Sequence, residues 1–293
     1  MRTESLQVVL TIHYNDMIKK GYCVAANGHT HYENFPVASL LLPPRLRHPI
    51  ALIYRFAREA DDLADEGDAP APARLDQLER FREQLRRIER GVPPDIPWFA
   101  ALAAVIREHD LPVSAFADLL SAFAQDVTRQ RYANISEVLD YCRRSANPVG
   151  RLLLHLVRRA SDRNFEWSDS ICSALQLVNF WQDVAIDYAR GRIYLPQDEM
   201  RRHGVTEQHI AERRCDDAWR TLIQFQIHRA RGMLQAGAPL GRTLPGRIGL
   251  EIRSTVQGGL RILEKLERAR CDMFRRRPVL MWHDWPVLLA RAL

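Results

Sequence analysis

The chain has 293 residues, of which 46% are hydrophobic and 27% charged, so it can bury a sizeable core in one large or two small domains. No run approaches the roughly 20 uncharged apolar residues of a membrane-spanning helix, and the first residues lack the apolar stretch of a signal peptide. Five widely spaced cysteines without a Cys-x-x-Cys pair predict reduced thiols in a cytoplasmic protein. The net charge of +6 suits anionic small molecules, an anionic membrane surface or nucleic acid, without deciding among them.

The sequence predicts helices along most of the chain and no strand of convincing length. Pro49 occupies a position typical of a first helical turn, and the helix is expected to run to Glu66 before Gly67 stops it. Asn147–Gly150 predicts a break inside a longer periodic segment. The further helices are expected within residues 75–90, 98–108, 113–127, 135–159, 173–196, 198–203, 207–213, 216–234 and 247–270. Without repeats or linkers, we expect one all-α domain over residues 1–293.

One of these helices carries a polar stripe that points to function. Four residues at steps of three and four share one of its faces: Gln176, Asn179, Asp183 and Asp187. The other faces are apolar, which is typical of a helix inside a protein. Two carboxylates there would cost several kcal/mol each if they were dry and unpaired. We therefore expect the stripe to face a polar cavity and a cation to be supplied from elsewhere in the chain or by a ligand.

A second acidic cluster lies at the end of the first predicted helix. Asp61 and Asp65 are four residues apart and share a face, as do Asp62 and Glu66. Like charges at this spacing repel each other, and the helix dipole favours cations at this end. Taken alone, the cluster also fits a solvated helix end that is neutralised by nearby arginines. The presence of two such stripes on apolar helices favours a shared function.

Two facing aspartate pairs would form an all-oxygen, highly charged site of the kind that Mg²⁺ prefers. An EF-hand is excluded because neither cluster has the required loop glycine and closing glutamate, and a di-iron site lacks its Glu-x-x-His motif. Such metals suit a substrate with a diphosphate head and a hydrocarbon tail. They neutralise the leaving diphosphate, while an apolar cavity shields a carbocation from water. We expect the two pairs to face each other across the mouth of one such cavity.

In this order, the motifs resemble those of the squalene/phytoene synthase family, which consists of all-α isoprenoid enzymes. Asp61–Asp65 resembles the first aspartate-rich motif of the family, and Gln176–Asp187 resembles the second. Between them, Tyr141–Gly150 falls where the family has its Tyr-Cys…Ala-Gly-x-Val-Gly segment. The similarity extends from His31 to about Arg277. It implies a single-domain helical bundle of the isoprenoid-synthase type around a central apolar cavity.

The resemblance also implies roles for individual residues. The implied ligands of Mg²⁺ and the diphosphate are Asp61, Asp65, Asn179, Asp183 and Asp187. The implied substrate contacts are Asn34, Tyr54, Arg58, Gln176, Asn179, Arg192 and Tyr194. The implied catalytic residues are the four aspartates and Tyr141, whose ring and hydroxyl can stabilise a neighbouring cation.

Several of these positions keep a second interpretation. Tyr54 and Tyr194 fit packing in the core as well as a place in the site. Arg192 fits either a diphosphate contact or an ion pair with a nearby acid. Asp126 matches another acidic position of the family, but a helix cap or a salt bridge explains it equally well. Arg58 is expected to contact diphosphate directly, because the guanidinium fork suits that group.

Within the family, the chain most resembles the hydroxysqualene synthase branch of bacterial hopanoid biosynthesis, through Asn34-Phe-Pro-Val-Ala-Ser and Asn179-Phe-Trp-Gln-Asp. Asn34 stands where many relatives have serine, Gln182 replaces an arginine, Asn147-Pro148 interrupts a glycine pattern, and Gly259 takes the place of a tyrosine. The branch is understood to ionise presqualene diphosphate and to quench the rearranged cation with water, so no NADPH is expected. We expect Asn34, Gln182 or the room left by Gly259 to place that water.

The predicted activity is thus that of a Mg²⁺-dependent carbon–oxygen lyase making hydroxysqualene from presqualene diphosphate. One alternative is a head-to-head prenyl transferase that makes presqualene diphosphate, squalene or phytoene from two prenyl diphosphates. Another is a non-catalytic helical adaptor at the membrane, favoured by the basic Arg275–Arg277 and the apolar Val279–Trp282. Nucleic acid is not an expected partner, because the arginines are scattered and no binding motif appears. The expected partners besides the substrate are the inner membrane face, touched peripherally, and neighbouring enzymes of the pathway.

Overall fold

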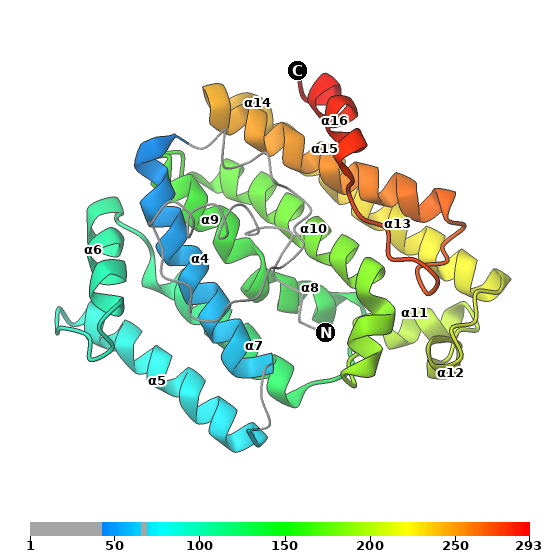
Figure 1. Ribbon diagram of the computed structural model, residues 1–293, viewed down its shortest axis with the longest axis horizontal. Helices are drawn as coiled ribbons and strands as arrows, with labels where there is room; N and C mark the ends of the chain where they lie inside the picture. The colour runs from blue at the N-terminus through cyan, green and yellow to red at the C-terminus, as the bar shows by residue number, and fades with distance from the viewer. Residues whose placement is uncertain (1–42, 66–68) are drawn as a thin grey trace. The chain divides into compact units, whose positions relative to one another are not determined.

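The computed structural model describes residues 43–65 and 69–293 (Figure 1). Within these ranges it contains helices and no strand, apart from one isolated bridge between Arg131 and Ile193. The predicted all-α fold is therefore confirmed for the described residues. They divide into two compact units, the first built from residues 43–65, 69–128 and 144–165 and the second from 129–143 and 166–293. The prediction of one domain stays a prediction.

The first unit is organised around helix α4, Pro44–Asp65, which packs against α5, α6, α7 and α9. The bounds of these partners are α5 Ala71–Glu89, α6 Phe99–His109, α7 Val113–Thr128 and α9 Asn147–Leu156. At its centre, Phe56 of α4 is fully buried and meets Phe116 of α7 edge to face, with 5.1 Å between the ring centroids. This aromatic packing gives the helix that carries the first acidic cluster a fixed position in its unit.

The second unit is organised around the long helix α10, Asp162–Ala189, of which the part from residue 166 onward belongs to it. Its other helices are α8 Ile135–Ser145, α11 Gln197–Arg202, α12 Glu207–Ala211, α13 Asp217–Gly237, α14 Leu240–Thr243, α15 Gly246–Arg268, the 3₁₀ turn η1 Trp282–Asp284 and α16 Trp285–Ala292. Helices α10, α13 and α15 approach closely at Gly259. A Cβ atom there would lie 2.8 Å from Leu175 Cδ2 and 3.0 Å from Leu234 Cδ1.

The expectation that Gly259 leaves room for a water molecule is therefore wrong. The space beside its Cα is filled by the leucines of two neighbouring helices, and the absent side chain allows the helices to pack closely. The position of Pro49 was also misjudged, because Pro44 begins α4 and the helix runs on through Pro49. The predicted break in the middle of the chain is confirmed. Helix α8 ends at Ser145, and Pro148 lies in the first turn of α9, where its missing N–H is not needed.

Other features lie beyond the predicted elements or partly outside the described ranges. Helix α10 begins at Asp162, well before the predicted stretch, and η1 and α16 were not predicted. No helix of the described residues is long and apolar enough to cross a membrane. Four cysteines are free, as predicted: Cys142, Cys172, Cys215 and Cys271. The fifth, Cys23, lies outside the described residues together with Asn34, Glu66 and Gly67.

Candidate functional site

The last turns of α4 bring carboxylates together in the first unit. Asp61 is only 3% exposed, and its Oδ2 atom makes no hydrogen bond. Burial raises the pKa of Asp61 well above its ordinary value, and the negative charges of Asp65, Asp62 and Asp126 raise it further. Arg58 opposes them, with Nη1 at 3.6 Å from Asp61 Oδ2 and Nη2 at 2.6 Å from Asp62 Oδ1. We call these four aspartates the α4 acidic cluster.

Asp126 is the member that the predicted site lacked. It lies on α7, is buried, and is close enough to Asp61 to raise the pKa of that carboxyl. Helices α4 and α7 pack against each other, which brings the two aspartates together from distant parts of the sequence. The signal in the sequence was its match to an acidic family position, which a cap or a salt bridge explained equally well. Its place beside Asp61 favours membership of the site.

The predicted stripe on α10 is buried along its whole length in the second unit. Gln176, Asn179, Asp183 and Asp187 are between 1% and 4% exposed. Gln176 Nε2 makes no hydrogen bond, and neither polar atom of Asn179 makes one of normal geometry, although this amide lies close enough to Asp183 to lower its pKa. Buried polar atoms normally have partners, so this surface is suited to a polar ligand.

The cation expected from elsewhere in the chain is Arg277. Its guanidinium donates to both oxygens of Asp183, through Nε to Oδ1 and through Nη2 to Oδ2 at 3.2 Å. Burial raises the pKa of Asp183, while Arg277 and Arg190 partly offset this effect. Next in the chain, Gln182 Nε2 donates to the carbonyl oxygen of Pro278 at 2.5 Å. Two consecutive side chains of α10 therefore hold the segment at Arg277 and Pro278.

Aromatic rings lie beside this stripe in the second unit. Tyr141 of α8 is fully buried, with 5.6 Å between its ring centroid and that of Tyr194. Phe180 of α10 stacks on Tyr194 at 3.8 Å, and Tyr132 lies 5.9 Å from Tyr141. The structure thus brings the predicted Tyr141 and Tyr194 together and adds two rings that the prediction missed. Aromatic faces stabilise a neighbouring cation.

The other predicted site residues are distributed over both units. Tyr54 is buried on α4 in the first unit, one turn before Arg58, and Arg192 is buried just after α10 in the second. Asn34 lies outside the described residues. Because the two aspartate pairs belong to different units, their facing across an apolar cavity stays a prediction.

The chemistry of the carboxylates can be compared with that of a Mg²⁺ site. Among residues 43–65 and 69–293, no three His, Cys, Asp or Glu side chains converge as a preformed metal site. The α4 acidic cluster nevertheless fits a divalent cation, since it offers carboxylate oxygens, and Asp61 Oδ2 makes no hydrogen bond with the described residues. Asp183 can also bind a divalent cation, but only after Arg277 releases one of the carboxylate oxygens of Asp183, because its guanidinium donates to both of them.

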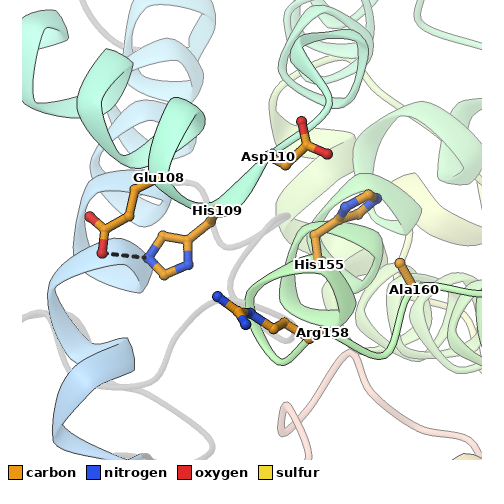
Figure 2. A pocket seen from close by; sticks show the side chains of 6 residues that line it. All are labelled: Glu108, His109, Asp110, His155, Arg158 and Ala160. Carbon is orange, nitrogen blue, oxygen red and sulfur yellow. Dashed lines mark ion pairs between the residues drawn. The ribbon is translucent and has the colours of Figure 1, made fainter.

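A pocket of about 390 Å³ lies in another part of the first unit, where α6 and α9 end (Figure 2). Its lining consists of Glu108, His109, Asp110, His155, Arg158 and Ala160. His109 and Glu108 form an ion pair at 3.8 Å, and most of the lining residues are exposed. None of the predicted site residues belongs to it. Its mixed charges and exposure are typical of a solvated recess in the surface.

Comparisons with known proteins cover most of the chain. The profile of the squalene/phytoene synthase family matches residues 29–283. Hydroxysqualene synthase of Rhodopseudomonas palustris is 36% identical over 229 residues, which cover 77% of each chain, and 15-cis-phytoene synthase of Synechococcus elongatus is 29% identical over 276 residues, or 89% of each. The crystal structure of a squalene synthase from Alicyclobacillus acidocaldarius has a TM-score of 0.76 at 36% identity and covers 82% of this chain and 90% of that one. The range matched by the profile contains all the predicted site residues.

Proposed function

Since the chain belongs to the squalene/phytoene synthase family, whose members are enzymes of isoprenoid synthesis, we propose that it converts presqualene diphosphate and water to hydroxysqualene and diphosphate with the help of Mg²⁺. The observation that carries the proposal is the α4 acidic cluster. Asp61 is buried, and burial together with the charges of Asp65, Asp62 and Asp126 disfavours its ionised form, which a bound cation would stabilise. The similarity to hydroxysqualene synthases supports the choice of reaction within the family.

In this proposal, Asp61 and Asp65 on α4 would hold Mg²⁺ in the first unit, and Asn179, Asp183 and Asp187 on α10 would be its ligands in the second. The bound metal supplies positive charge that stabilises the leaving diphosphate. Arg58 and Arg192 are the proposed charged donors to diphosphate, and Gln176 adds the amide Nε2, which has no hydrogen-bond partner among the described residues. Asp126 adds negative charge beside Asp61 and so strengthens the attraction for the cation. Tyr54 completes the proposed substrate contacts on α4.

The aromatic cluster is the part of the site suited to the carbocation. Tyr141, Tyr194 and Phe180 pack against one another, and each of them is at most 3% exposed. Rings stabilise a cation without forming a bond to it, and their burial keeps bulk water away. The cation therefore survives until one placed water attacks it. The water oxygen forms the new carbon–oxygen bond, and its proton passes to the released diphosphate.

The rival reaction is head-to-head coupling of two prenyl diphosphates, which the similarity to 15-cis-phytoene synthase favours. The decisive experiment incubates the purified protein and Mg²⁺ with presqualene diphosphate, or with farnesyl or geranylgeranyl diphosphate, in ¹⁸O-labelled water and without NADPH. Hydroxysqualene carrying ¹⁸O from presqualene diphosphate alone would support the proposal. Coupled products from the prenyl diphosphates, with presqualene diphosphate left unchanged, would refute it.

We further propose that the protein works in the cytoplasm in peripheral contact with the inner membrane face and beside other enzymes of its pathway.

A further inference from the structure

An exposed apolar stripe runs along η1 and α16 at the end of the chain. Five large hydrophobic side chains of the described residues are exposed, Leu289 at 37%: Val92, Phe225, Trp282, Leu289 and Leu293. Three of them lie in this one region, where Trp282 is 80% and Leu293 91% exposed. Leu289 of α16 and Leu293, directly after its end, are four residues apart and so lie on the same side of the helix, while Trp282 lies in the 3₁₀ turn that precedes it. Single exposed hydrophobic residues are normal, but a group of them in one region is not.

The other face of α16 is anchored to the second unit. Leu288 and Ala292 are buried, and α16 packs against α15. At the start of this region, Asp284 is fully buried and pairs with Arg261, at 2.9 Å from Nε to Oδ1, and with Lys265. The inner side of α16 is therefore held against α15, and its opposite side is exposed to solvent.

Positive charge accompanies the stripe. The segment from Arg268 to Leu293 contains six arginines and two aspartates, and of these arginines Arg277 pairs with Asp183 and Arg291 with Glu264. One of the two aspartates, Asp284, is already buried in ion pairs. Arg275 and Arg276 are exposed, and the side chain of Arg275 remains 90% accessible despite its contact with Asp272. An exposed pair of this kind contributes little and leaves the guanidinium available.

We propose that η1 and α16, together with Arg275 and Arg276, form the surface by which the protein docks on an anionic lipid bilayer. Tryptophan prefers the headgroup region, the two leucines can reach the acyl boundary, and the arginines attract anionic headgroups. A second copy of the chain is a poorer occupant of this surface, because self-association would bring two cationic segments together. The inference makes the proposed peripheral contact specific and does not depend on the reaction.

The test measures sedimentation with vesicles of phosphatidylcholine, with or without phosphatidylglycerol, in the absence of substrate. The wild type should bind the anionic vesicles, and added salt should weaken its binding. The triple variant Trp282→Ala/Leu289→Ser/Leu293→Ser should lose about tenfold or more in partitioning. The matched control Val92→Ser/Phe225→Ser, which removes exposed hydrophobic side chains elsewhere, should bind as the wild type does. Equal binding by the triple variant and the wild type would overturn the proposal.

The charge is tested separately with Arg275→Gln/Arg276→Gln, which should weaken binding to anionic vesicles about 30-fold, since each arginine near such a surface contributes about 1 kcal/mol and about 1.4 kcal/mol is tenfold. The control pair Arg80→Gln/Arg107→Gln, exposed on the first unit, should have little effect. Light scattering without lipid should give the wild type and the triple variant the same mass. A dimer lost in the triple variant would assign the stripe to self-association instead. Turnover of detergent-dispersed substrate should be unchanged in the triple variant, so a failure of docking is distinguishable from a failure of the proposed reaction.

Discussion

Replacing Glu251 by glutamine should stabilise the protein, and increasingly so as the pH rises. Glu251 lies on α15, is 5% exposed, and its Oε2 atom makes no hydrogen bond. Burial raises the pKa of this carboxyl from 4.5 to about 8. Between these two values the folded protein keeps a proton that the unfolded chain releases. The free energy of unfolding is therefore largest below the unfolded pKa and falls as the pH rises towards the folded one.

The size of the stability change follows from the interval between the unfolded and the folded pKa of Glu251. Each pH unit within it lowers the free energy of unfolding by about 1.4 kcal/mol, so the cost at pH 7 is about 3 kcal/mol relative to pH 4.5. Glu251→Gln removes the ionisable group and keeps its shape. The variant should match the wild type near pH 4.5 and exceed it by up to about 3 kcal/mol at pH 7. Above pH 8 the difference should stop growing.

Urea denaturation followed by circular dichroism at pH values from 4.5 to 9 measures this difference directly. Ser254→Ala is the matched control, because its buried hydroxyl lies one turn further along the same face of α15 and also lacks a hydrogen bond. Its effect on stability should not depend on pH. A constant difference between Glu251→Gln and the wild type over this range would show that Glu251 ionises freely in the folded protein and would refute the reasoning.

Three further substitutions test the site and its scaffold. Asp183→Asn should lower kcat by about 100-fold or more with an unchanged circular dichroism spectrum, and retained turnover at saturating Mg²⁺ would exclude this carboxylate as a metal ligand. Mg²⁺ should raise the melting temperature less in Asp126→Asn than in the wild type. Asp118→Asn on the same helix is the control and should keep the full rise. Equal rises in both variants would place Asp126 outside the site. Gly259→Ala should cost about 1–3 kcal/mol of stability, because its Cβ would lie 2.8 Å from Leu175 Cδ2. An unchanged urea midpoint would mean that the helices there separate easily.

The helices were predictable from the sequence because their signals are local. Apolar periodicity and the Asn147-Pro148 break determine elements over a few turns, and the structure has most of them near the predicted places, although α10 begins eleven residues earlier, at Asp162. Pro49 misled the prediction because a proline can lie inside a helix when the true first turn, here at Pro44, comes shortly before it. Helix α16 escaped prediction because it is short and its apolar residues lie on two faces, one buried and one exposed.

The candidate site was predictable only as far as its residues share a helix. The stripe on α10 could be inferred from spacing, and its burial is confirmed. Arg277 could not be identified as the partner of Asp183, because 94 residues separate the two in the sequence. Asp126 likewise approaches Asp61 only through the packing of α7 on α4. Contacts of this kind depend on tertiary packing, which no local spacing encodes.

The structure also bears on which side chain places the quenching water. The sequence suggested three positions at which the chain departs from its relatives, but the space beside Gly259 is filled by its neighbours and Asn34 lies outside the described residues. Gln182 is different, because its Nε2 donates to the carbonyl oxygen of Pro278 while its buried Oε1 accepts no hydrogen bond from the described residues. An acceptor fixed in this way, adjacent in sequence to Asp183, is suited to orient one water molecule. An arginine at this position has no acceptor atom, so it could not hold a water in this manner even if it kept the contact with Pro278.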